Sequence, residues 1–266
     1  MLFEEQKFER LEETISKLEP SPEKTLANRF LNLEKGNLLK LDVSPSNETD
    51  PRELVFFIKF GLDYYSPTES KKWLVELENL VKKREFAQFR PYYDFYKCKI
   101  AFEEKRIDQS EIEMESLWKK FKELSPYLMV ETILLRSEIL TARKREREGM
   151  DLIKWGMELF PNLPNPIEAK VKIGLAQIAF KSQQFKLAEE VAGKMKTLCE
   201  MHQLSKWLLK TSLLLSEISI IMGYTEQANA HLTTCLSLSM KYASPNEIVE
   251  IYKFLSINNL LQKRYD

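Results

Sequence analysis

The residues best suited to metal chemistry are two short pairs of cysteine and histidine in the C-terminal half of the chain. Cys199 is followed by His202 at the third position, and His231 is followed by Cys235 at the fourth. Thiolates and imidazoles at such local spacings are the ligands that structural zinc uses. His202 and His231 are the only histidines among the 266 residues. Only these two could therefore serve as the base of a Ser-His or Cys-His pair in nucleophilic catalysis.

Other patterns associated with catalysis are weak. The adjacent acids Glu12-Glu13, Glu103-Glu104 and Glu189-Glu190 lie in segments with helical periodicity, where neighbours diverge by about 100° around the axis. We interpret them as solvated helix faces. No G-x-x-x-x-G-K-[ST] or G-x-G-x-x-G run is present to cradle a phosphate. We therefore predict a non-enzymatic protein with no catalytic residues and no cofactor.

Composition narrows the classes of partner. The 40 basic and 40 acidic residues give a formal net charge of zero, which removes the bulk electrostatic attraction for nucleic acid or an anionic membrane. No apolar run approaches the roughly 18 residues needed to span a bilayer, and the acidic N-terminus is unlike a signal or transit peptide. Three cysteines are too few for a disulfide framework. We expect reduced thiols in a cytoplasmic protein without a membrane partner.

The elements that would position any site are helix pairs, which are clearest over residues 165–242. Ala176 and Ala188 stand twelve residues apart, and Ser216 and Ala228 repeat that spacing forty residues later. Two antiparallel helices cross closely only where side chains are small. Each pair therefore predicts one helix hairpin.

The same register continues in both directions. Backward it reaches Ser137 with Gly149 and Cys98 with Ser110, and forward it reaches Ser256, so that the first-helix markers are spaced 39, 39, 40 and 40 residues apart. Arg136 and Lys97 stand where the clearest copies have leucine, which leaves the core contact at those two positions open.

A leucine followed by a small residue in the first helix, with small or apolar residues in the second, resembles the tetratricopeptide repeat family. The resemblance covers about residues 91–263. It implies an all-α fold, in which antiparallel helix hairpins form an α-solenoid with a right-handed superhelical twist. The loop-like segment 42–50 divides an N-terminal helical cap, 1–50, from a repeat domain, 51–266, that is clearest over 130–263; one continuous solenoid is the alternative.

Helix starts are marked by a recurring motif. Asp50-Pro51, Ser66-Pro67, Asn165-Pro166 and Ser244-Pro245 are each followed by a glutamate two residues after the proline. The first residue can cap a helix, proline suits the first helical position, and the glutamate can close a capping box. About thirteen helices are expected, the first over about 3–19 and the second from residue 21. No segment shows sustained period-2 alternation, so no sheet is expected.

The resemblance also implies a binding surface, because first helices line the concave groove in this family. Carrying the groove positions over by register gives Tyr92, Phe95, Lys99, Glu131, Leu134, Glu138, Lys170, Ile173, Gln177, Lys210, Leu213 and Glu217. A groove of mixed charge with an apolar floor suits an amphipathic helix or an extended peptide. Glu138 and Glu217 occupy positions that capture of a C-terminal carboxylate would need neutral or positive.

The repeat register argues against the zinc site. It places Cys199 and His202 late in one second helix, and His231 and Cys235 early in the next, so the pairs are offset by a turn or more. Cys235 also falls at a small core position. We expect core cysteines, surface histidines and no metal.

Two further segments have a packing interpretation beside a binding one. The basic run 143–147 falls at a turn within a repeat, where a solvated loop is expected and a docking patch for an acidic partner is the alternative. The aromatic segment 86–102 interleaves with basic residues, as in single-strand binders, but at helical spacing we interpret it as packing. The four tryptophans are interpreted in the same way.

The last predicted helix, 246–263, is more apolar than a terminal capping helix normally is. Either the natural chain continues, or another molecule covers the helix, including a second copy by self-association. The leading hypothesis is a protein- or peptide-binding scaffold. The alternatives are a regulatory or sensor module of a longer signalling protein and, from another class, a nucleic-acid-binding helical repeat, which the zero net charge disfavours.

Overall fold

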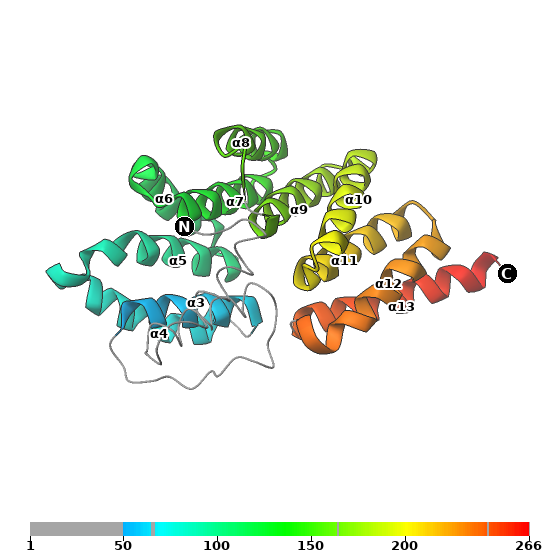
Figure 1. Ribbon diagram of the computed structural model, residues 1–266, viewed down its shortest axis with the longest axis horizontal. Coiled ribbons are helices and arrows are strands. Elements are labelled where there is room, and N and C mark those ends of the chain that lie inside the picture. Colours follow the sequence, from blue (N-terminus) through cyan, green and yellow to red (C-terminus); the bar gives the residue numbers. More distant parts are fainter. Residues whose placement is uncertain (1–49, 65–66, 164, 244, 266) are drawn as a thin grey trace. The chain divides into compact units, whose positions relative to one another are not determined.

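The computed structural model describes residues 50–64, 67–163, 165–243 and 245–265. Within these ranges the protein is all-α: eleven α-helices and two 3-10 helices are joined by short turns, without a strand (Figure 1). The helices predicted over 3–19 and from residue 21, and nearly all of the predicted cap 1–50, lie outside the described residues. No helix in the described part of the chain is long and apolar enough to cross a membrane.

The described residues fall into two compact units that divide within α8. We call residues 50–156 the N-terminal unit and residues 157–265 the C-terminal unit. In chain order the helices are α3 (Pro51–Tyr64), α4 (Pro67–Val81), η2 (Arg84–Phe89), α5 (Arg90–Glu103), α6 (Ile107–Trp118), η3 (Phe121–Glu123), α7 (Pro126–Ala142), α8 (Glu146–Leu159), α9 (Asn165–Lys181), α10 (Phe185–Met201), α11 (Ser205–Ile221), α12 (Thr225–Tyr242) and α13 (Pro245–Tyr265).

The four helix starts predicted from proline motifs are confirmed, since α3, α4, α9 and α13 begin at these motifs. Asp50 caps α3 by accepting the Arg52 backbone N–H at 2.8 Å. The sequence analysis missed a fifth start of the same kind. Ser125 precedes Pro126 and caps α7, its hydroxyl accepting the Leu128 backbone N–H at 3.3 Å.

One turn geometry closes four of the hairpins. The residue after each first helix's cap has a positive φ: 64° at Lys105, 61° at Lys144, 60° at Gln183 and 79° at Gly223. The next residue donates its N–H to the carbonyl five positions back, from Arg106 to Ala101 in the first copy and from Tyr224 to Ser219 in the last, at 2.9 and 2.8 Å. This is the Schellman motif. Its left-handed residues are spaced 39, 39 and 40 apart, so the period is a property of the backbone.

The small residues predicted at the hairpin crossings are buried. Cys98, Ser110, Ser137, Ala176, Ala188, Ser216 and Ala228 all have no exposed surface. In the α5–α6 hairpin the two helices approach closely enough for the Ser110 hydroxyl to donate to the Cys98 carbonyl across the crossing, at 3.2 Å. The exception is Ser256 on α13, which is exposed.

The hairpin α3–α4 follows the same register, although the sequence analysis left residues before 90 open. Ile58 stands forty residues before Cys98, and Ser70, twelve residues later, donates its hydroxyl to the Ile58 carbonyl at 3.1 Å. The clearance comes from Gly61, because a Cβ there would lie 2.4 Å from Ser70 Oγ. The small residue of the first helix lies three positions later than in the other copies, so the twelve-residue spacing of small residues is absent from this hairpin's sequence.

First helices contact one another within each unit. In the N-terminal unit α5 contacts both α3 and α7, and in the C-terminal unit α11 contacts both α9 and α13. We call these sets the first-helix rows. Within each unit second helices also pack against the first helix that follows: α4 against α5 and α6 against α7 in the N-terminal unit, and α10 against α11 and α12 against α13 in the C-terminal unit (Figure 1).

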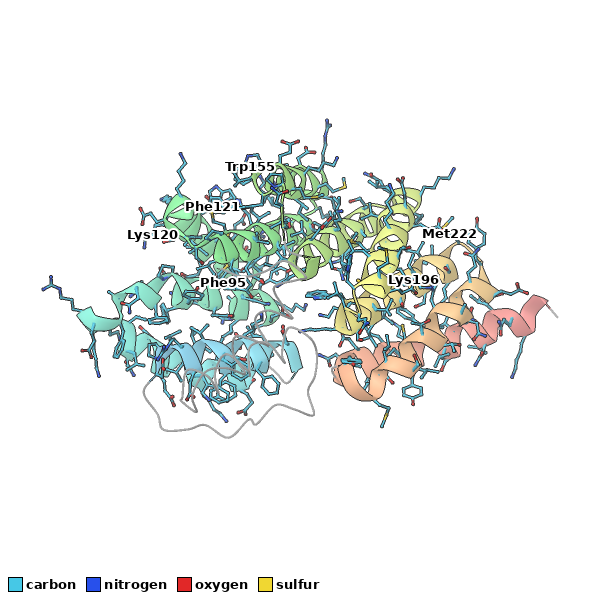
Figure 2. The ribbon with its side chains drawn as sticks, in the orientation of Figure 1. Phe95, Lys120, Phe121, Trp155, Lys196 and Met222 are labelled. Carbon is cyan, nitrogen blue, oxygen red and sulfur yellow. The ribbon has the colours of Figure 1, made fainter. Side chains whose placement is uncertain are left out.

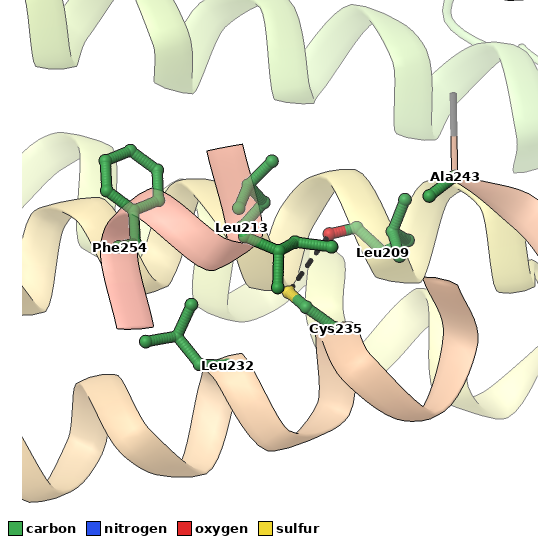
Figure 3. Packing of buried hydrophobic residues seen from close by; sticks show 7 residues of the cluster. Leu209, Leu213, Leu232, Cys235, Ala243 and Phe254 are labelled. Carbon is green, nitrogen blue, oxygen red and sulfur yellow. Dashed lines mark hydrogen bonds between the residues drawn. The ribbon is translucent and has the colours of Figure 1, made fainter. Parts of the chain in front are cut away.

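An apolar core fills the last hairpin of the C-terminal unit. Leu209 and Leu213 of α11 meet Leu232 of α12 and Phe254 of α13, all at most 8% exposed (Figure 3). The Cys235 thiol lies 3.8 Å from the Leu209 carbonyl, in the same layer. Each such side chain removed from water contributes about 1.5–3 kcal/mol. This core fixes α13 on α11 and α12.

Candidate partner-binding face

The predicted partner-binding residues are divided between the two first-helix rows. On α5 and α7 they are Tyr92, Phe95, Lys99, Glu131 and Glu138; on α9 and α11 they are Lys170, Gln177, Lys210 and Glu217. Because α5 contacts α7 and α9 contacts α11, each set lies on adjacent helices.

Lys99 is the centre of a charged cluster in the N-terminal unit. Burial opposes its charged form, but Asp63 of α3 and Glu131 and Glu138 of α7 outweigh this, and the net effect raises the pKa of Lys99. Glu131 is only 7% exposed. Three helices therefore contribute charges to one cluster, and three of its members, Lys99, Glu131 and Glu138, were predicted to lie on a common face.

Two tyrosines and a second lysine complete this cluster. Lys59 of α3 donates from Nζ to the Tyr127 hydroxyl at 2.9 Å, and its ammonium also lies 5.4 Å from the centre of the Tyr127 ring. Burial, and next the charge of Glu131, raise the pKa of both Tyr96 and Tyr127 well above the usual value. Both hydroxyls therefore stay protonated and can donate or accept hydrogen bonds within the cluster.

The aromatic members of the predicted N-terminal set have unequal exposure. Phe95 is 2% exposed and packs edge-on against Tyr96, with ring centres 5.1 Å apart (Figure 2). Leu134 is also buried, at 8%. Tyr92 is half-buried, with its ring 6.3 Å from that of Phe89. Of these three side chains, Tyr92 offers the most surface to a partner.

In the C-terminal unit Lys210 links α11 to α13. Its ammonium pairs with Glu247 at 3.7 Å and lies 5.7 Å from the centre of the Trp207 ring. Trp207 itself is 6% exposed and packs with Ile173 of α9. Lys210 is thus partly held by neighbours and partly open to solvent.

Two carboxylates with raised pKa values, Glu217 and Glu250, lie on adjacent first helices of this row. Burial raises the pKa of Glu217, and the next largest cause is the charge of Glu250 on α13. The pKa of Glu250 is raised as well, first by burial and then by Glu247. Both acids are therefore in a local field that favours a cation or a hydrogen-bond donor.

The remaining predicted residues of this unit range from buried to open. Ile173 and Leu213 are buried at 2% and 7% and belong to the core. Lys170 is half-buried, and Gln177 is exposed on α9. Gln177 is therefore the most accessible of the predicted contact residues in this unit.

The cysteine and histidine pairs are built into the packing. Cys199 and Cys235 are free thiols without exposed surface, and burial raises the pKa of each to about 12. His202 and His231 are half-buried, where surface positions were expected. Burial, followed by the charge of Lys196, lowers the pKa of His231. Among the described residues no group of three or more His, Cys, Asp or Glu side chains could hold a metal ion.

The basic run 143–147 is engaged within the N-terminal unit. Arg143 donates to Glu111 of α6 at 3.0 Å and pairs with Asp108, while Arg145 pairs with Glu148 at 2.7 Å. The Arg143 bonds connect the hairpin turn to the preceding second helix α6, and the Arg145 pair lies at the start of α8. They favour a structural role for the run, although its charges remain at the surface.

Arg136 stands where the clearest copies have leucine, and its side chain is 21% exposed. Its guanidinium lies 4.3 Å from the centre of the Trp118 ring and pairs with Glu115 at 2.8 Å. Trp118 also packs against Phe121 and Trp155, with ring centres 4.5 and 6.2 Å away (Figure 2). Trp155 keeps 41% of its surface exposed. The replacement therefore builds a cation–aromatic cluster from Arg136 on α7, Trp118 on α6 and Trp155 on α8.

Sequence reasoning missed several members of the charged clusters, and the repeat period could have found them. Lys59 and Asp63 stand exactly forty residues before Lys99 and Glu103, and Glu250 stands forty after Lys210. One further step of the period in each direction would have placed all three in the first-helix rows.

Comparison with known proteins gives neither a matching family model nor a matching curated relative.

Proposed function

We propose that this protein is a tetratricopeptide-like α-solenoid that binds a protein or peptide partner through its first-helix rows and performs no chemistry. The proposal rests on one observation: the hairpin backbone repeats regularly, whereas the side chains on the first helices vary from copy to copy. The left-handed turn and the buried small pair recur every 39 or 40 residues. By contrast, the first-helix position that holds Lys99 in one copy holds Glu138, Gln177 and Glu217 in the following copies.

Such a frame makes a preformed surface at little entropic cost, because its helices are already ordered by their own packing. The variable positions carry lysine, glutamate, glutamine and tyrosine above buried Leu134, Ile173 and Leu213. Paired charges over an apolar layer suit an amphipathic helix or an extended peptide with both charged and apolar side chains. The buried, protonated thiols fit a reducing, cytoplasmic setting.

The test is affinity capture from a native lysate with two matched triple variants. One carries Lys170→Ala, Gln177→Ala and Glu217→Ala on the first-helix row of the C-terminal unit. The other carries Lys186→Ala, Glu226→Ala and Gln227→Ala, which remove the same three residue types from exposed positions on α10 and α12. We expect a partner that is retained by the wild type and the second variant and lost by the first.

The captured partner is then titrated in purified form by calorimetry against all three proteins. A loss of affinity confined to the first variant supports the proposal. Equal affinity for all three would place the contact elsewhere, and loss only in the second variant would assign binding to the second helices.

A further inference from the structure

The indole of Trp207 is a buried hydrogen-bond donor in the first turn of α11. Trp207 is 6% exposed and packs with residues of α9 and α10, including Ile173 and Met195. Its Nε1 atom is buried and has no hydrogen-bond acceptor among the described residues. A buried tryptophan N–H usually has a partner, because its loss of water is otherwise uncompensated. This N–H is therefore available to an acceptor from another molecule.

Lysine side chains gather around the same indole. The ammonium groups of Lys206 and Lys210 lie 5.8 and 5.7 Å from the centre of the Trp207 ring. Lys206 is only 4% exposed, which is uncommon for a lysine. A third lysine, Lys170, follows Ala169 on α9, and Ala169 belongs to the same apolar cluster as Trp207. The surroundings of the indole are therefore rich in positive charge.

Part of this charge is balanced within the C-terminal unit. Glu247 of α13 pairs with Lys210 at 3.7 Å, and Glu250 interacts with the same lysine. The backbone acts in the opposite direction, because α11 is a 17-residue helix and helix N-termini carry a partial positive charge. Its N-cap, Leu204, makes no side-chain capping bond. A further negative group is thus favoured at the start of α11.

We propose that Lys170, Lys206, Trp207 and Lys210 bind the carboxylate of an acidic side chain, Asp or Glu, of the partner peptide. The inference rests on the proposed function, since it specifies what the first-helix row of the C-terminal unit recognises. One carboxylate oxygen accepts the indole N–H and the other pairs with a lysine ammonium, because a carboxylate offers only acceptors. A side chain reaches a buried donor while its own backbone stays at the surface.

The lysines also form the entry to this site. The Lys210 side chain is 35% exposed and Lys170 is half-buried, and both have flexible four-carbon stems that can turn aside without moving a helix. The contact between Lys210 and Glu247, at 3.7 Å, is longer than the roughly 2.9 Å of a charge-assisted hydrogen bond. Lys210 can therefore turn towards an incoming carboxylate at small cost.

The test is a titration of the full chain followed by the indole N–H signals in ¹H–¹⁵N correlation spectra. The chain has four tryptophans, and Trp207→Phe identifies the Trp207 signal by its loss. The probe is N-acetylglutamate N-methylamide, added to about 50 mM because one ion pair with a hydrogen bond gives only millimolar affinity. We expect a saturable downfield shift of the Trp207 signal, whereas N-acetylglutamine N-methylamide, at ionic strength matched with sodium chloride, leaves it in place.

A matched pair of variants then tests the role of the lysines. Lys210→Gln should weaken binding of the probe at least tenfold, because a charge-assisted contact is lost. Lys186→Gln, at an exposed position of α10, should leave it unchanged. A Trp207 signal that does not move, or that moves equally with the glutamine probe, overturns the proposal, and so does equal affinity in the two variants.

Two further outcomes separate this site from other possibilities. Tighter binding of N-acetylalanine, whose carboxylate is that of a chain terminus, would overturn the assignment to an acidic side chain. The probe contains no partner protein, so a failed titration would reject this site while affinity capture could still support the proposed function. A failed capture with a successful titration would reject the proposed function alone.

Discussion

The two units use one hairpin frame with different chemistry at its crossings. In the α3–α4 and α5–α6 hairpins of the N-terminal unit the crossing helices are tied by hydroxyls: Ser70 donates to the Ile58 carbonyl and Ser110 to the Cys98 carbonyl, each across the hairpin. On α7 the Ser137 hydroxyl instead donates to the Leu134 carbonyl of its own helix. In the C-terminal unit Ala176 and Ala188 have no exposed surface, and the Ser216 hydroxyl donates to the Leu213 carbonyl in its own helix. The α3–α4 and α5–α6 crossings are thus stabilised by polar bonds across the hairpin, whereas the serines at the α7 and α11 crossing positions bond within their own helices.

The first-helix rows of the two units also differ in which ionisable groups have shifted pKa values. Lys99, Tyr96 and Tyr127 in the N-terminal unit all have raised pKa values, so their protonated forms are held up to alkaline pH. In the C-terminal unit the raised pKa values belong to carboxylates, Glu217 and Glu250. The repeated hairpin backbone therefore does not determine the charge of the surface that it presents. Binding surfaces of different charge can be built on the same backbone.

The largest expected effect is on the shared frame itself. Leucine at a buried crossing, by Ala228→Leu or by Ser110→Leu, should destabilise its hairpin by about 3 kcal/mol, because the helices must separate to admit it. Hydrogen exchange with mass spectrometry should show faster exchange in α11 and α12 for the first variant and in α5 and α6 for the second. Ala230→Leu and Ser116→Leu, at exposed positions of the same second helices, should leave exchange unchanged. Equal exchange in the crossing variants and these controls would mean that the crossings are not close-packed.

Alkaline pH should destabilise the first-helix row of the N-terminal unit, which contains the tyrosines with raised pKa values. The folded pKa values of Tyr96 and Tyr127 lie above that of a free tyrosine, so their contribution to stability is complete below pH 10 and is lost as the pH rises further; the raised pKa of Lys99 acts in the same direction above pH 10.5. Each buried tyrosine should add a loss of about 1.4 kcal/mol per pH unit.

Denaturant unfolding between pH 8 and 11.5 measures this loss. The variant Tyr96→Phe with Tyr127→Phe should show a flatter pH profile than the wild type, whereas Tyr252→Phe, at an exposed position, should reproduce the wild-type profile. Parallel profiles for all three proteins would contradict the assigned burial of these hydroxyls.

A matched serine pair tests the difference between the crossings. Ser110→Ala removes a hydroxyl that bonds across the hairpin, and about 1 kcal/mol of stability should be lost. Ser216→Ala removes a hydroxyl that bonds at 2.7 Å within its own helix, and alanine is the better helix former, so the change should be close to zero. Urea unfolding of both variants measures the two values. Equal losses would show that the units do not differ in this respect.

The smallest effect concerns the acids of the C-terminal row. Because the folded pKa of Glu217 is raised, its charge opposes folding at neutral pH and ceases to do so as the pH falls below about 4.5. Glu217→Gln should therefore stabilise by about 0.5 kcal/mol at pH 7, with no gain near pH 4. Glu190→Gln, whose carboxylate has a lowered pKa through its bond to Lys194, should show no such gain. Thermal melts at both pH values distinguish the two.

Much of the hairpin frame was predictable because it follows from small residues and capping motifs. Close helix crossings are predicted directly by the small pairs Ala176 with Ala188 and Ser216 with Ala228. The α3–α4 hairpin escaped prediction, since Ile58 occupies the small position and Gly61, one turn later, supplies the clearance. The space for a close crossing can come from a small residue one turn away from the usual position. A comparison of equivalent positions in the sequence does not detect such a shift.

The candidate face was less predictable than the frame. The register brought Lys99, Glu131 and Glu138 correctly onto adjacent helices, but it could not tell that Phe95 is turned into the packing and 2% exposed. It also missed Lys59 and Asp63, whose helix had not been placed in the repeat. Burial depends on neighbouring helices as well as on position within one helix, and the sequence pattern contains only the latter.

Site-specific photocrosslinking can show whether a partner binds through the first-helix row. Benzoylphenylalanine is introduced at Gln177 on α9 or, as a control, at Lys186 on α10, both exposed, and the protein is irradiated in its native lysate. We expect a discrete crosslinked protein from position 177 that position 186 does not give and that unlabelled wild type competes away. Crosslinks from position 186 alone, or the same products from both, would contradict binding through the first helices.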